Sequence, residues 1–117
     1  MADWVPVTAV KDLQRRKKNL VQAGGESIAL FMVRDRVFAL RDICIHEERS
    51  LSKGAVLRDR VVCPGHQWQF DLETGWVEEQ ERCQPTYDVK VEDGTVYVVP
   101  VPRIRVTQAG PATLGSS

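Results

Sequence analysis

The chain lacks several features that would place it in a large class of proteins. Sixteen basic residues balance sixteen acidic ones, with no long block of one charge, so nucleic-acid binding has little support. The longest apolar run, Ile28 to Val33, is too short to cross a bilayer. Residues 1–6 have neither the basic nor the apolar region of a signal peptide. We therefore expect a cytoplasmic protein that uses neither nucleic acid nor a membrane as a partner.

The composition is otherwise that of a globular protein. With 117 residues, 43% of them hydrophobic and 27% charged, the chain is long enough for one domain with a core and too short for two. No glycine fingerprint for a flavin or a nicotinamide is present.

Both histidines of the chain lie close to cysteines, in the pattern Cys-x-His-x16-Cys-x2-His. The four residues are Cys44, His46, Cys63 and His66. Two thiolates and two imidazoles from two loops are the ligand set of a Rieske [2Fe–2S] cluster. Structural zinc takes the same ligand types, although zinc sites usually pair two cysteines and then two histidines. A third interpretation makes the cysteines buried hydrophobic residues and the histidines incidental.

The flank of the second pair strongly resembles a known family. Residues 63–75, with a Cys-Pro-x-His-x-Trp-x-Phe-Asp-x-x-Thr-Gly pattern, resemble the second cluster loop of bacterial Rieske ferredoxins and of the Rieske small subunit of NADH-dependent nitrite reductase. The resemblance implies one [2Fe–2S] cluster per chain, held by Cys44, His46, Cys63 and His66. It also implies the all-β Rieske fold, an antiparallel β-sandwich base domain with an inserted cluster-binding lobe.

Respiratory Rieske proteins resemble the chain at the ligands but add a disulfide between the two loops. The matching positions here are Arg49 and Gly65, so that bridge cannot form. Cys83 is the one cysteine left and has no intrachain partner outside the ligand set. The high-potential relatives also have a tyrosine hydroxyl where this chain has Phe70. We therefore expect a potential at the low end of the Rieske range.

Short apolar stretches separated by turn signals indicate an all-β domain. The expected strands of the base are Trp4 to Val10, Asn19 to Ala23, Ser27 to Val33, Val37 to Leu40, Tyr87 to Glu92 and Thr95 to Val99. Asp93-Gly94 predicts a tight hairpin, and the continuous run Ile28 to Val33 predicts a strand buried on both faces. We expect a Rieske domain over 1–103, with a cluster-binding lobe at about 42–84, and a tail over 104–117.

These features predict an electron carrier with no catalytic site of its own. An oxygenase of the Rieske type also needs a mononuclear iron held by two histidines and a carboxylate, and the cluster would use both histidines of this chain. The favoured interpretation is a ferredoxin that accepts electrons from a flavin-dependent reductase and delivers them to a Rieske oxygenase. The alternative is the small subunit of a nitrite reductase, with its large subunit as acceptor. A zinc-stabilised binding module is the third class.

Overall fold

The computed structural model describes residues 3–43, 50–64, 68–77 and 82–104. In these ranges the chain is mostly strand, as expected, with two short helices. The elements are β1 (Val5–Ala9), α1 (Val10–Arg16), β2 (Lys18–Ala23), β3 (Glu26–Val33), β4 (Arg36–Arg41), the 3-10 helix η1 (Leu51–Lys53), β5 (Ala55–Leu57), β6 (Arg60–Val62), β7 (Gln69–Asp71), β8 (Trp76–Val77), β9 (Arg82–Cys83), β10 (Thr86–Glu92) and β11 (Thr95–Arg103).

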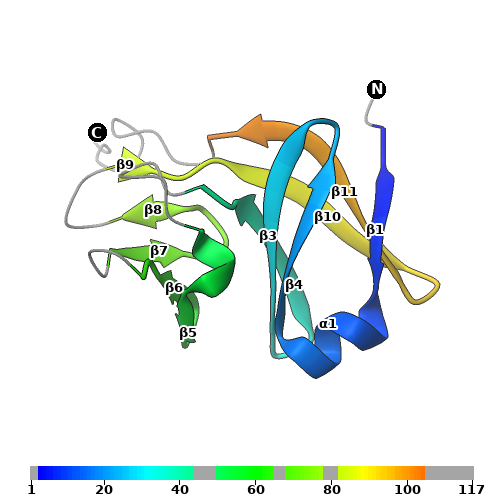
Figure 1. Ribbon diagram of the computed structural model, residues 1–117, viewed down its shortest axis with the longest axis horizontal. Helices are drawn as coiled ribbons and strands as arrows, with labels where there is room; N and C mark the ends of the chain where they lie inside the picture. The colour runs from blue at the N-terminus through cyan, green and yellow to red at the C-terminus, as the bar shows by residue number, and fades with distance from the viewer. Residues whose placement is uncertain (1–2, 44–49, 65–67, 78–81, 105–117) are drawn as a thin grey trace, which may run out of the picture.

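The strands form one large antiparallel sheet and two small ones (Figure 1). The large sheet has the order β1-β11-β10-β4-β3-β2, and its two edge strands, β1 and β2, contact each other, so the sheet curls around its inner face. The small sheets, β5-β6-β7 and β8-β9, lie between β4 and β10 in the sequence and to one side of the large sheet in space.

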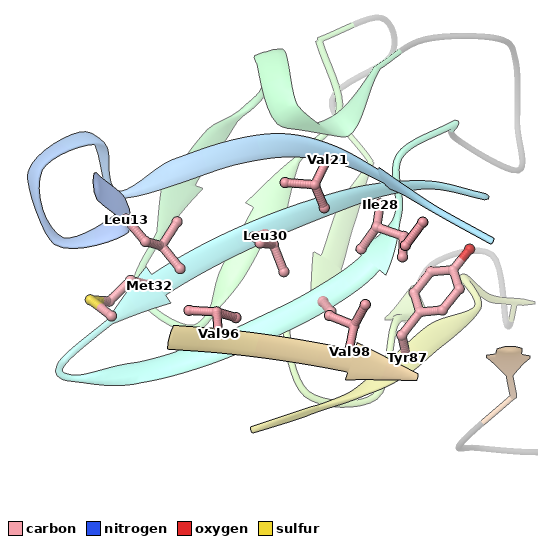
Figure 2. Close-up of a cluster of buried hydrophobic side chains, with 10 residues drawn as sticks. Leu13, Val21, Ile28, Leu30, Met32, Tyr87, Val96 and Val98 are labelled. Atoms are coloured by element: carbon pink, nitrogen blue, oxygen red, sulfur yellow. The ribbon is translucent and has the colours of Figure 1, made fainter. Parts of the chain in front are cut away.

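Strand β3 connects the two halves of the molecule because both of its faces are buried, as its apolar run predicts. Ile28, Leu30 and Met32 point into the core enclosed by the large sheet, together with Tyr87 and other residues shown in Figure 2. The alternate residues of β3 belong to a second core beneath the small sheets. The members of this second core are Ala29, Phe31, Leu40, Leu51, Val61, Cys63, Phe70, Leu72 and Val77.

Three hairpins of the large sheet have two-residue turns with positive φ at both positions, the type I′ pattern. Gly24-Gly25 joins β2 to β3, and Asp93-Gly94 joins β10 to β11, as the sequence predicts. Arg34-Asp35 joins β3 to β4 with φ values of 52° and 66°. The strand after this turn therefore begins at Arg36, one residue before the predicted start.

Helix α1 fills the connection between β1 and β2. Its seven residues bury Leu13 completely, and Lys17 ends the helix in the left-handed conformation, donating its N–H to the Leu13 carbonyl. The basic run Arg15 to Lys18 therefore closes a helix and starts β2.

Candidate metal centre

Of the four predicted cluster ligands, Cys63 lies in the part of the chain that the structure describes. Its side chain is fully buried and belongs to the second core. It directly follows β6, so the sheet β5-β6-β7 fixes its backbone. Cys44, His46 and His66 lie outside the described residues, as do Arg49 and Gly65.

The second loop is closed at its base by a backbone hydrogen bond. The Cys63 N–H donates to the Trp68 carbonyl at 2.8 Å, directly beyond the β6–β7 pair Val62–Gln69. Trp68 packs against the second core and Phe70 lies inside it, with their ring centroids 6.4 Å apart. Apolar side chains therefore line the start of β7 beside Cys63, and the buried ring of Phe70 carries no hydroxyl group.

The first loop is closed by the buried carboxylate of Asp42, which is only 2% exposed. Its two oxygens accept the Ser50 hydroxyl at 2.6 Å and the Ser52 N–H at 2.9 Å, while its carbonyl accepts the Leu51 N–H at 2.7 Å. An isolated bridge pairs Ile43 with Ser50. Asp42, two residues before Cys44, is thus bound to the segment 50–52 that follows 44–49, so the residues on either side of 44–49 are joined.

The segment after the first loop lies against the strand that leads to the second loop. A Cβ on Gly54 would collide with the carbonyl oxygen of Val62, the residue before Cys63. Gly54 has an extended backbone with φ of −81°, so glycine is required by this close approach to the backbone of β6 and not by a turn. Lys18 Nζ donates to the Gly54 carbonyl at 2.5 Å and so ties this contact to β2.

A fully buried amide, Gln84, holds the chain where it enters the first loop. Its Nε2 donates to the carbonyls of Arg41 and Ile43, both at 2.7 Å. Its own N–H donates to the Gly75 carbonyl at 2.7 Å, so the residue joins three segments. The sequence does not predict the roles of Gln84 and Asp42, because a single buried polar residue leaves no periodic pattern.

A further polar cluster lies on β3, β4 and β10. The Tyr87 hydroxyl donates to Glu26 Oε1 at 2.8 Å, and Arg41 Nη2 lies 3.6 Å from the same oxygen. Burial, together with the hydrogen bond to the Glu26 carboxylate, raises the pKa of Tyr87 to about 12. The hydroxyl therefore stays protonated at neutral pH and keeps its hydrogen bond to Glu26.

The half-buried Cys83 donates its thiol S–H to the Thr74 carbonyl at 2.9 Å.

These supports fit a cluster held between two loops. The side chain of Cys63 is fully buried in the second core. Hydrogen bonds of Asp42 and Gln84 hold the chain just before 44–49. The family model for the Rieske [2Fe–2S] domain matches residues 3–102. The chain belongs to the Rieske [2Fe–2S] family.

Known proteins of the family are similar along nearly their whole length. The chain is 33% identical over 104 residues to the anthranilate 1,2-dioxygenase ferredoxin subunit of Burkholderia cepacia, covering 84% of this chain and 93% of the relative. It superposes with a TM-score of 0.78 and 30% identity on a chain of the complex of reduced oxygenase and oxidised ferredoxin in carbazole 1,9a-dioxygenase, covering 86% and 96% of the two chains. A nitrite reductase NADPH small subunit gives a TM-score of 0.72 and 27% identity, covering 82% and 97%.

Membership of this family assigns one [2Fe–2S] cluster to the chain. A Rieske cluster transfers one electron at a time, and the replacement of two thiolates by neutral imidazoles makes it easier to reduce than an all-cysteine cluster. Among the described residues, no helix is long and apolar enough to span a membrane.

Proposed function

We propose that this protein is the ferredoxin component of a Rieske oxygenase system. It takes single electrons from a flavin-dependent reductase and passes them to the terminal oxygenase, in the cytoplasm and without a catalytic site of its own. The observation that carries this proposal is the match to the anthranilate 1,2-dioxygenase ferredoxin subunit over 93% of that protein, because the shared length is that of a small carrier. In structural superposition, the nitrite reductase subunit has a TM-score of 0.72 and 27% identity, against 0.78 and 30% for the chain of the carbazole 1,9a-dioxygenase complex.

We further propose that Cys44, His46, Cys63 and His66 hold the cluster. The cysteines would bind one iron and the histidines the other, where the transferred electron resides. The Rieske domain would comprise residues 1–103, with a cluster-binding lobe at about 42–84 and a tail over 104–117. The buried position of Cys63 and the fixed start of 44–49 support this assignment.

The ligand assignment is tested by a matched pair of cysteine variants. Cys63→Ala should give colourless protein, whereas Cys83→Ala should remain red-brown, with two irons and two sulfides per chain and an EPR signal only after reduction. A full cluster in Cys63→Ala, or one zinc in the unmodified protein, would contradict the assignment.

The physiological role is tested by anaerobic electron transfer between the purified protein and a panel of enzymes. The panel contains flavin-dependent reductases as donors, and Rieske oxygenases and nitrite reductase large subunits as acceptors. We expect rapid reoxidation by at least one oxygenase. Reoxidation only by a nitrite reductase large subunit would establish the alternative function.

A further inference from the structure

The tripeptide Arg-Asp-Arg occurs twice in this chain, at 34–36 and at 58–60. Both copies occupy the same structural position: the first two residues form a two-residue hairpin turn, and the third begins the next strand. One turn joins β3 to β4 and the other joins β5 to β6. All six residues are exposed, so packing in the core does not explain either copy.

The backbone at these turns is unfavourable for the residues that occupy it. Arg34 and Arg58 have φ values of 52° and 60°, and Lys17, at the end of α1, has 71°. Positive φ favours glycine or asparagine at hairpin turns and helix ends, and the turns Gly24-Gly25 and Asp93-Gly94 of the same protein follow that rule. Strained residues that the fold does not need often have a functional role.

The three strained cations lie along one side of the molecule. The Lys17 carbonyl accepts the N–H of Met32, two residues before Arg34. A surface pocket of about 160 Å³ is lined by Arg34 on one turn and Asp59 on the other. In Figure 1, α1, the β3–β4 connection and the end of β5 all lie along the lower edge.

We call Lys17, 34–36 and 58–60 the cationic edge. Its seven residues are five cations and two carboxylates, a net charge of +3 in a chain whose overall charge is zero. Asp71, the β7 partner of Arg60, and Glu73 line the same pocket and place two further negative charges beside it. Arg36 lies 3.7 Å from Glu73, with both side chains more than 60% exposed. In the described part of the chain no ion pair involves the other four cations, so most of this charge faces solvent.

We propose that the cationic edge is a docking surface for an acidic region on one of the protein's redox partners. This inference rests on the proposed function, since it requires a protein that approaches the cluster. Arg60 begins the three-residue strand that leads to Cys63, so the two residues are about 10 Å apart. A typical protein interface buries about 800 Å² on each partner. A partner that covers the Cys63 end of β6 with a patch of this size therefore extends to Arg60.

The strained turns provide a test in which charge and stability respond differently. Arg34→Gly and Arg58→Gly each remove a cation and give the turn its preferred residue, so the melting temperature should stay the same or rise. Asp35→Gly makes the same backbone change at the neighbouring position but removes a negative charge. Asp93→Gly makes it at the β10–β11 turn, outside the cationic edge.

The readout is the second-order rate of electron transfer with the reductase and the oxygenase that pass the assay described above. For Arg34→Gly/Arg58→Gly we expect a loss of about three- to tenfold with one partner at about 20 mM salt, which shrinks to less than about twofold at 0.5 M salt. Asp35→Gly should be faster than the unmodified protein, and Asp93→Gly should be unchanged. Equal rates for Arg34→Gly and Asp35→Gly with both partners would overturn the proposal.

A second measurement does not depend on finding a partner. Titration with polyglutamate, followed by amide NMR, should shift the residues of the cationic edge in the unmodified protein and not in Arg34→Gly/Arg58→Gly. Shifts elsewhere would contradict the proposal. Binding to phosphatidylglycerol vesicles or to duplex DNA that is lost in the same variant would overturn it in favour of a membrane or nucleic-acid surface. If no enzyme in the panel exchanges electrons, the proposed function fails, and the polyglutamate result alone decides whether this edge binds acidic chains.

Discussion

Gln84 makes a quantitative prediction about how the first cluster loop is held. Replacement by methionine keeps a long unbranched side chain but removes the amide that donates to the Arg41 and Ile43 carbonyls. Each buried carbonyl left without a donor costs about 1–3 kcal/mol. With some relaxation, Gln84→Met should destabilise the entry to the first loop by about 2–4 kcal/mol. The two hydrophobic cores, of which Gln84 is not a member, should stay intact.

The assay is the rate at which the visible absorption of the cluster bleaches in the presence of an iron chelator. When the loop recloses faster than iron is captured, this rate follows the opening equilibrium. A cost of 2–4 kcal/mol then corresponds to an acceleration of about 30- to 800-fold, at 1.4 kcal/mol for each factor of ten. Gln22→Met is the control, because the hydrogen bond of Gln22 to Ser27 is exposed, and it should change the rate less than about threefold. If Gln84→Met also stays within threefold, Gln84 does not hold the loop.

Three further perturbations test other parts of the structure. Gly54→Ala should cost about 1–3 kcal/mol and accelerate bleaching, because the new Cβ meets the Val62 carbonyl. Gly25→Ala, whose Cβ meets no atom but whose φ of 80° strains the β2–β3 turn of the base, should leave bleaching unchanged. Tyr87→Phe should remove the phenolate absorbance step near pH 12. In the unmodified protein the free energy of unfolding should fall by up to about 1.4 kcal/mol per pH unit between pH 10 and 12, because tyrosine ionises there in the unfolded chain while Tyr87 stays protonated in the folded protein. The variant should not show this fall. Phe70→Tyr should raise the reduction potential by roughly 50 mV if the new hydroxyl reaches the cluster, because a hydrogen bond that favours the reduced state by about 1 kcal/mol shifts a one-electron potential by that amount. An unchanged potential with an intact cluster would show that position 70 does not set the potential.

Much of the fold could be predicted from the sequence because its signals are local. Asp93-Gly94 between alternating runs predicts the β10–β11 hairpin, and the apolar run Ile28 to Val33 predicts a strand buried on both faces. Trp68 and Phe70, two positions apart in a strand, lie on one face by strand periodicity, and both contribute to the second core. Each of these signals depends only on residues a few positions apart, so no knowledge of distant contacts was needed.

The supports of the metal centre could not be predicted because they join residues that are far apart in the sequence. Gln84 donates to carbonyls more than 40 positions away, and Gly54 is needed because of the backbone of Val62. The start of β4 was missed for the opposite reason. Arg34-Asp35 carries no turn residue of the expected kind, so the strained turn was read as part of a longer connection.

The arrangement of β3 explains how a small protein can hold a cluster firmly and still let it be approached. Alternate residues of this strand belong to the two cores, so the small sheets pack on a surface that the large sheet already holds rigid. Opening the small sheets would expose Phe31 and Leu40 while leaving Ile28 and Leu30 buried. The base therefore does not depend on the cluster for its own stability.

The hydrogen bonds of Asp42 and Gln84 hold the loop entries to that base. Gln84 uses a neutral amide donor and Asp42 a single buried carboxylate, and neither forms a surface ion pair. These hydrogen bonds therefore do not weaken as the salt concentration is raised. Changes in salt can then act on partner attraction at exposed charges without loosening the site that carries the electron.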